Sequence, residues 1–287
     1  MGLTVASWFE VLINGFELGF IYALVALGFS LIYGVGRIIF CTHGEIYMMG
    51  AMFCYLLITR LSWPYPLALF SVTILTGIFG LILDRALFRR FYGNDFNIFI
   101  VSLALAMIIA NSFMELFGPQ AVGITEPFPG IVSFLTIDLA RDKLIVAVIS
   151  VGLILALKFF FDRAKAGQAI RAVAQDPEAA SLQGINKSQI LSLTFFLSLA
   201  VAGAAGALVA PLYSVSTSMG QSALLDTFIV VILGGLGSFP GAILGGLLLG
   251  LLQSIGTIFI GHFAYLVSFT IVIIFLVIKP QGFFGHA

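Results

Sequence analysis

An all-α, polytopic transmembrane helical bundle is the fold class that this sequence predicts. Of its 287 residues, 61% are hydrophobic and only 9% are charged, and the mean hydropathy is +1.15. A soluble domain carries about 25% charged residues. Between Lys187 and Lys279, Asp226 is the only formal charge. Because even a globular protein must cover its outside with polar groups, the solvent for this chain is a bilayer.

Seven segments meet or approach the roughly 20 apolar residues that a membrane-spanning helix needs. They are 9–34, 65–84, 96–117, 143–161, 188–210, 242–260 and 263–278. The first is expected to be a retained span, because no Lys or Arg precedes Arg37 to form the basic start of a signal peptide. With two shorter segments, the prediction is eight or nine spans.

The two shorter segments are 44–59 and 224–236, and both are bordered by glycine. Short, interrupted segments at corresponding places in two halves point to a translocation route. The predicted path or hinge residues are Gly44, Glu45, Gly50, Gly234, Gly235 and Gly237. The alternative is ordinary tight packing of short helices, with Glu45 as a structural charge at a helix N-terminus.

Lys and Arg favour the cytoplasmic side of a membrane, and their distribution predicts an external N-terminus and a cytoplasmic C-terminus. Ten basic residues then lie inside: Arg37, Arg85, Arg89, Arg90, Lys158, Arg163, Lys165, Arg171, Lys187 and Lys279. Three lie outside: Arg60, Arg141 and Lys143. The longest polar stretches face opposite sides, 118–142 outside and 162–187 inside. Residues 1–287 are thus predicted to form a single membrane domain.

The cytoplasmic stretch has unusually well-defined helix signals. Asp176 is predicted to cap a helix that has Pro177 in its first position, and Gly184 to end that helix in the left-handed conformation. Asn186 then caps the next span, with Gln189 three residues on as in a capping box. The prediction is a two-turn helix at the membrane surface, which suits a docking surface for another protein.

Three stretches resemble the permeases of ATP-binding-cassette (ABC) importers for branched-chain, hydrophobic amino acids. The first stretch lies in the cytoplasmic loop and consists of Arg171, Asp176-Pro177, Glu178-Ala179-Ala180, Gly184 and Ile190. Near the N-terminus, Tyr33-Gly34 and His43-Gly44-Glu45 with Tyr47-Met48 and Gly50-Ala51 are similar to a second signature. The third is Leu233–Ser238 with Pro240-Gly241-Ala242. The chain departs from the family at Ile39–Thr42, where members usually have Asn before Phe-Ala.

The resemblance implies the smaller type of membrane subunit of a high-affinity importer in a bacterial inner membrane. Implied partners are a second, homologous permease, two cytoplasmic ATPases and an extracytoplasmic substrate-binding protein. No Gly-x-x-x-x-Gly-Lys-Ser/Thr motif occurs, so ATP and Mg are expected on the ATPases and no cofactor in this chain. The predicted ATPase-coupling residues are Arg171, Asp176, Pro177, Glu178, Ala179, Ala180, Gly184 and Asn186. Arg141 and Lys143 are the predicted docking residues for the binding protein.

Other functions find less support in the residues. The three histidines are far apart with no cysteine nearby, and no serine lies in a nucleophile motif, so neither a catalytic nor a metal site is predicted. A formal net charge of zero argues against nucleic acid. His43 and Glu45 are expected at the inner boundary, just before the first short segment, and Asp226 is expected to open the second. These residues and Glu17 stay open between structural and functional roles. Gln253 is expected to bridge helices. Alternatives to the amino acid permease are a permease for urea, amides or other amino acids, a stand-alone secondary transporter or channel, and an intramembrane enzyme.

Overall fold

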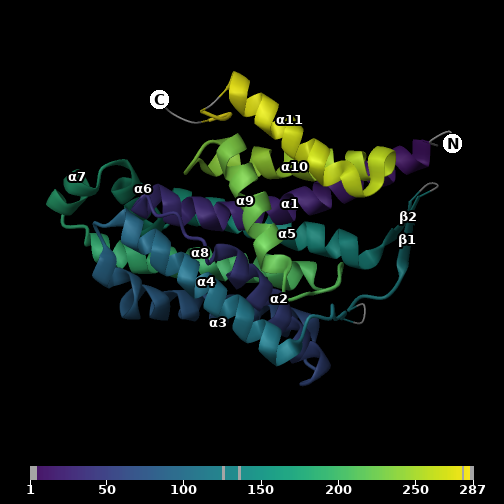
Figure 1. Ribbon diagram of the computed structural model, residues 1–287, viewed down its shortest axis with the longest axis horizontal. Coiled ribbons are helices and arrows are strands. Elements are labelled where there is room, and N and C mark those ends of the chain that lie inside the picture. Colours follow the sequence, from purple (N-terminus) through teal and green to yellow (C-terminus); the bar gives the residue numbers. More distant parts are fainter. Residues whose placement is uncertain (1–4, 125–126, 135–136, 280, 285–287) are drawn as a thin grey trace.

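Six long apolar helices form the frame of the molecule in a computed structural model that describes residues 5–124, 127–134, 137–279 and 281–284 (Figure 1). They are α1 (Val5–Gly36), α3 (Tyr65–Ala86), α4 (Asp95–Phe117), α5 (Arg141–Arg163), α8 (Lys187–Val209) and α10 (Phe239–Ile260). Each is long and apolar enough to cross a membrane. The predicted polytopic helical class is confirmed by these six.

The remaining helices are shorter. They are α2 (His43–Thr59), α6 (Lys165–Gln175), α7 (Pro177–Leu182), α9 (Met219–Gly234) and α11 (Ala264–Ile278), with 3₁₀ turns at Phe88–Phe91 and Gly261–Phe263. The second short segment was expected over 224–236, but α9 begins five residues earlier. Asp226 is therefore in the middle of a helix, and its expected place at the start of one is wrong.

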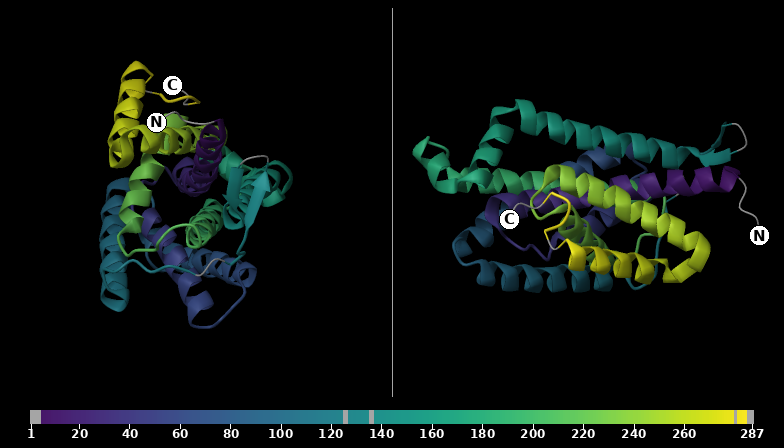
Figure 2. Two further views of the ribbon diagram at one scale, coloured as in Figure 1. Left: turned by 90° about the vertical axis from the view of Figure 1, so that its right-hand side faces the viewer. Right: turned by 90° about the horizontal axis from the view of Figure 1, so that it is seen from above.

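The two ends of the bundle differ in structure. One end holds the start of α1 and an antiparallel hairpin of β1 (Ile131–Phe134) and β2 (Ile137–Ala140), in which Val132 pairs with Leu139. We refer to it as the hairpin end. The opposite end, with α6 and α7, is called the loop end (Figure 2, right). The all-α prediction omitted the hairpin, because the polar, proline-containing stretch 118–142 gave no strand signal.

The core lies where α1 crosses α10 and where α8 packs on α2 and α3. Small residues permit these close approaches: a Cβ on Gly19 would lie 2.8 Å from the Cα of Leu247, and a Cβ on Gly80 would lie 2.7 Å from the carbonyl oxygen of Phe195. Membrane helices pack by such van der Waals contact, because lipid gives no hydrophobic drive for helix association.

The chain re-enters the bundle after α1 instead of turning at its end. Residues 37–42 are non-helical, and α2 begins beside Val25, whose carbonyl oxygen lies 2.9 Å from His43 Nε2. Val25 lies eleven residues before the end of α1 at Gly36. The expectation that His43 and Glu45 lie at the inner boundary is therefore wrong: both lie deep in the bundle, at the start of a helix of partial length.

Ser102 of α4 satisfies the irregular backbone of this re-entrant segment. Its hydroxyl accepts a hydrogen bond from Cys41 N at 3.2 Å, and its carbonyl accepts one from Thr42 Oγ1 at 2.6 Å. Ser102 is fully buried. Irregular backbone is tolerated at such depth only where protein or water forms hydrogen bonds with its polar groups. Ser102 forms such bonds with Cys41 and Thr42.

Helix α9 runs across the long helices and not along them (Figure 1). Its first turn lies against α2, and its last residue, Gly234, lies against Gly241 at the start of α10. The segment after α11 completes this end: Phe283 N donates to Leu233 O at 2.8 Å, and Phe284 N donates to Gly234 O at 3.0 Å. These bonds satisfy two of the carbonyl groups that every helix end leaves free.

Candidate functional site

The loop end carries the predicted coupling helix, and its caps have the geometry that the sequence indicates. Asp176 Oδ1 accepts hydrogen bonds from Glu178 N at 2.9 Å and Ala179 N at 3.0 Å, with Pro177 in the first position of α7. Gly184 has a φ of +80°. Asn186 Oδ1 accepts from Gln189 N at 3.2 Å and so caps α8.

Helix α7 exposes both charged and apolar side chains. Ala180 is its buried residue, while Glu178, Ala179 and Leu182 are exposed. The side chain of Leu182 is 88% exposed, more than any other large apolar side chain of the described residues. An exposed leucine beside a carboxylate at the tip of a capped helix is a surface that another protein can cover.

Helix α6 fixes α7 to the bundle. Gly167, Ile170 and Val173 form its buried face, and Gly167 packs on the backbone of Phe160 and Phe161 in α5. Its other face carries Arg171, which forms a 3.1 Å ion pair with Asp162 of α5. The two side chains are about half exposed, so the pair orients α6 more than it stabilises the fold.

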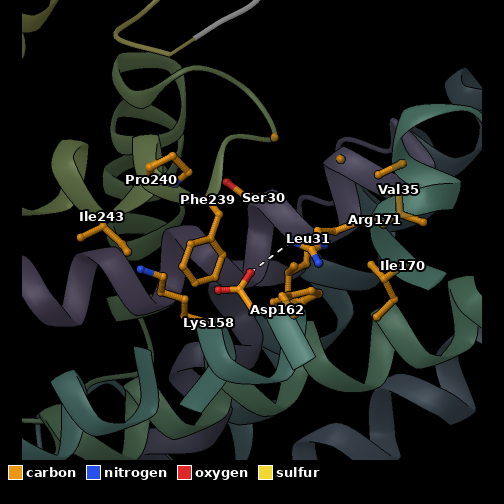
Figure 3. Close-up of a pocket in the computed structure, with 14 residues that line it drawn as sticks. Ser30, Leu31, Val35, Lys158, Asp162, Ile170, Arg171, Phe239, Pro240 and Ile243 are labelled. Atoms are coloured by element: carbon orange, nitrogen blue, oxygen red, sulfur yellow. Dashed lines mark hydrogen bonds and ion pairs between the residues drawn. The ribbon is translucent and has the colours of Figure 1, made fainter. Parts of the chain in front are cut away.

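A cavity of about 520 Å³ separates α6 from the ends of α1 and α10 (Figure 3). Arg171 lies in its wall, and so do Gly34 of α1 and the predicted hinge residue Gly237. Phe239 and Pro240 of α10 point into it from the opposite side (Figure 3). The structure thus brings one coupling residue and one hinge residue to the same cavity.

A second cavity, of about 410 Å³, lies on the other side of α6 and is polar. Its wall combines the coupling residues Asp176, Pro177 and Glu178 with the cations Arg37 and Lys187. The end of α1 and the start of α7 therefore share one polar cleft, whose wall contains both carboxylate and basic side chains.

The other predicted path residues lie deep in the bundle, where α2 meets α8 and α9. A Cβ on Gly44 would lie 2.8 Å from Leu224 Cβ, and one on Gly50 would lie 2.6 Å from the Cα of Gly203. The carboxylate of Glu45 lies over Gly220, at which a Cβ would be 2.5 Å from Glu45 Oε2. Gly44 and Glu45 thus lie where α2 crosses α9, and Gly50 lies where α2 crosses α8.

Glu45 also lines a third cavity, of about 390 Å³, between α2, α4 and α9. The glutamate is 8% exposed, and its Oε2 has no hydrogen-bond partner among the described residues. The wall is otherwise mostly apolar, with a few polar side chains. Its lining residues are Cys41, Leu103, Ala106, Met107, Ala110, Asn111, Met114, Thr217, Ser218, Gln221 and Leu224.

The two groups of predicted path residues do not meet each other. Gly234, Gly235 and Gly237 form the turn between α9 and α10 at the loop end, and a Cβ on Gly237 would lie 3.4 Å from the Cα of Gly34. Gly44 and Glu45 lie at the other end of α9, and Gly50 lies further along α2, against Gly203 of α8. Helix α9 is therefore the element that connects the Glu45 cavity to the loop end.

The structure contains two buried hydrogen-bond networks that the sequence predicted only in part. Tyr22 Oη donates to Gln253 Oε1 at 2.5 Å, and Gln253 Nε2 donates to Asp226 Oδ1 at 3.3 Å, which ties α1, α10 and α9 together. Asp84 of α3 accepts hydrogen bonds from Tyr92 and from Ser192 of α8. Gln253 was predicted to bridge helices, but Asp84 shows no distinguishing pattern in the sequence.

The predicted docking residues lie at the hairpin end, at the start of α5. Arg141 is exposed, and its guanidinium lies beside Gly130. Lys143 is half-buried, and its Nζ donates to Asn14 Oδ1 of α1 at 2.8 Å. Of the two basic side chains, that of Arg141 is therefore the more accessible to a partner.

Glu17 of α1 is buried, and neither carboxylate oxygen has a hydrogen-bond partner among the described residues.

The helical frame, the capped loop and the deep, glycine-lined crossing can be compared with known proteins. Residues 11–278 match the family model for the permease component of the branched-chain amino acid transport system. The chain belongs to this permease family. It is an integral, multi-pass protein of the inner membrane and a permease component, which is a non-catalytic subunit.

The permease is similar to several curated proteins over nearly its full length. It is 31% identical to the high-affinity branched-chain amino acid transport system permease protein BraD of Pseudomonas aeruginosa, over 97% of this chain and 96% of that protein. Identity to the protein LivH of Salmonella typhimurium, which has the same description, is 30% over 96% and 95%. A probable branched-chain amino acid permease, LivH of Methanocaldococcus jannaschii, is 27% identical over 91% and 88%. No solved structure matches the chain.

The described residues contain no group of three His, Cys, Asp or Glu side chains that could hold a metal ion. What the geometry does provide is a docking element at one end, a cavity with one buried carboxylate in the middle, and a transverse helix between them. Each of these parts suits transport of a solute better than catalysis.

Proposed function

We propose that this permease is the membrane subunit of an ATP-driven importer that carries branched-chain or other hydrophobic amino acids. The observation that carries the proposal is the capped helix α7, fixed by α6 and projecting Leu182 and Glu178 from the loop end. A rigid, capped helix in a loop is expected where the loop transmits movement from another protein. The full-length similarity to branched-chain amino acid permeases supports the substrate class.

In this proposal the loop end is cytoplasmic and the hairpin end is external. The ten basic residues that favour the inside belong to segments at the loop end, while Arg60, Arg141 and Lys143 belong to the hairpin end. The chain then crosses nine times if α2 and α9 are counted, as a single membrane domain. The polar cleft with Asp176 and Glu178 faces the cytoplasm, where an ATPase would press on α7.

The proposed partners are two cytoplasmic ATPases, a second homologous permease and an extracytoplasmic binding protein that delivers the solute. ATP and Mg belong to the ATPases in this scheme, and this chain holds no cofactor. The solute path runs beside α2 and α9, and movement of α7 reaches it through α6 and the turn at Gly234–Gly237. The binding protein docks on the hairpin end, where Arg141 is exposed.

Reconstitution tests this proposal. The permease, its partner permease and the ATPases are placed in proteoliposomes with binding protein outside, and uptake of radiolabelled L-leucine, L-lysine and urea is measured. We expect uptake of leucine only with ATP inside, and none with an ATPase whose P-loop lysine is replaced. Leucine uptake by the permease alone, driven by an ion gradient, would instead establish a secondary transporter. Uptake of urea without leucine would overturn the substrate class.

A further inference from the structure

We propose that the cavity between α2, α4 and α9 is a solute-binding station on the path, in which the carboxylate of Glu45 binds the ammonium group of an amino acid. The proposal rests on the proposed function and adds to it a defined binding site and a role for one residue. The ligand class is a primary amine with an aliphatic side chain, of which the hydrophobic amino acids are examples.

The first argument is the state of Glu45. It is 8% exposed, Oε2 has no hydrogen-bond partner among the described residues, and it lines the cavity. A buried carboxylate without a partner is costly, so a retained one calls for a partner that arrives from outside. No Lys, Arg or His lines this cavity, so the compensating cation is not supplied by the lining residues.

The second argument is the way that the surroundings orient the carboxylate. Glu45 lies in the first turn of α2, and it faces Gly220 in the first turn of α9. The positive ends of two helix dipoles thus lie near this carboxyl group. The glycine leaves room for the carboxylate at this position, because a side chain at 220 would collide with Oε2. The carboxyl group is held in place while its Oε2 has no hydrogen-bond partner among the described residues.

The third argument is the wall. Leu103, Met107, Met114 and Leu224 provide apolar surface of the kind that takes an aliphatic side chain. Ser218 and Gln221, at the start of α9, are exposed, and the hydroxyl and amide they offer can donate to a substrate carboxylate. A volume of about 390 Å³ is within the range of small-molecule sites.

A divalent metal ion fits this cavity less well than an amine does. Calcium takes six to eight oxygen ligands and magnesium demands a near-complete octahedron, whereas the lining has one carboxylate and few other oxygens. An ammonium group needs only two or three acceptors, and it comes attached to the apolar chain that the wall accommodates.

Protection of an introduced cysteine measures binding directly. Ala110, a lining residue, is replaced by Cys in a permease with Cys41→Ala and Cys54→Ala, within the assembled complex and without ATP. Labelling by a small water-soluble thiol reagent is followed against L-leucine, isoamylamine and 4-methylpentanoate. We expect protection by leucine and by the amine, which both carry the ammonium group, and none by the acid, which lacks it.

Glu45→Gln should raise the leucine and isoamylamine concentrations for half-protection by about tenfold or more, because a charge-assisted hydrogen bond is lost. Gly220→Ala, which displaces the carboxylate but keeps its charge, should act in the same direction. Glu115→Gln, an exposed glutamate of α4 outside the cavity, is the matched control and should change nothing. If Glu45→Gln does not assemble, Glu45→Asp withdraws the carboxylate by one methylene and should weaken protection.

Unchanged protection in Glu45→Gln, or in Glu45→Asp where the glutamine variant fails, overturns the proposal, and so does equal protection by 4-methylpentanoate. ATP-driven leucine uptake by the unmodified complex is measured in parallel. If leucine is taken up but protection does not depend on Glu45, the binding station is wrong and the proposed importer function stands. Absence of uptake for every hydrophobic amino acid removes the proposed function itself, whatever the protection shows.

Discussion

The hydroxyl of Thr42 donates a 2.6 Å hydrogen bond to the carbonyl of Ser102, and the Ser102 hydroxyl accepts one from the neighbouring Cys41 N. The re-entrant segment is thus attached to α4 by both polar groups of a single buried residue. This attachment sets where α2 begins, and so it sets the depth of Glu45.

Ser102→Ala should lower the stability of the permease. The Cys41 N–H would be left without a partner in a buried site, which costs about 1–3 kcal/mol. The measurement is the melting temperature of the purified permease in detergent. Ser112→Ala, an exposed serine of the same helix, is the control. Equal melting temperatures for the two variants would contradict the role given to Ser102.

Gly50→Ala should disrupt the crossing of α2 and α8. The new methyl group would lie 2.6 Å from the Cα of Gly203, a backbone atom that cannot move aside. Overpacking of this kind costs about 1–3 kcal/mol, and more where backbone must shift. We expect poor expression and early melting. Gly152→Ala in α5, where nothing lies within 4 Å of the new atom, should express normally.

The sequence predicted the fold class, the order of the long helices and the caps of α7. Hydropathy and capping residues are local signals, and a helix such as α8 needs little else. The hairpin β1–β2 and the start of α9 were missed, because each depends on contacts between segments. Strand β1 depends on pairing with β2, and the first turn of α9 depends on the packing of Gly220 against Gly44 and Glu45 of α2.

The candidate site could be predicted only in part. Gly44, Glu45 and Gly50 stood out by residue type, but their depth follows from Ser102, whose partners lie some sixty residues earlier in the chain. The cavity itself is a property of three helices that are distant in sequence. No pattern in α4 marks Leu103 or Met107 as lining residues, since every face of that helix is apolar.

Gly184→Val should uncouple the permease from its ATPases. At φ +80°, a β-branched residue is strained by about 1–2 kcal/mol, enough to shift the end of α7. Gly184→Asn is the matched control, because asparagine adopts this conformation more readily. In proteoliposomes we expect the valine variant to insert and assemble but to lose leucine uptake. Normal uptake with normal ATP hydrolysis would show that α7 does not couple.

Gln253→Leu should destabilise the permease by about 1–3 kcal/mol, because Tyr22 and the buried Asp226 lose a shared partner. Adding Asp226→Asn should recover part of the loss, since a neutral amide is less costly to bury unpaired than a carboxylate. Melting of the single and double variants measures this coupling. If the two changes are strictly additive, the network does not act as a unit.

Arg141→Glu should slow docking of the binding protein, and the effect should shrink as salt is added, as expected of an exposed charge. Initial uptake rates at limiting binding protein, at low and high ionic strength, provide the measurement. Lys143→Glu should act less through docking, because its ammonium is bonded to Asn14. An Arg141 effect that is independent of salt would indicate a structural role and no docking contact.

The hydrogen bonds from Phe283 and Phe284 to the end of α9 impose an order on biosynthesis. Helix α9 leaves the ribosome well before the residues that cap it, and α10 and α11 must be made in between. Until then, the carbonyls of Leu233 and Gly234 lack their final donors. Maturation of the transverse helix is therefore a late event, which accompanies the arrival of the last membrane segment and does not precede it.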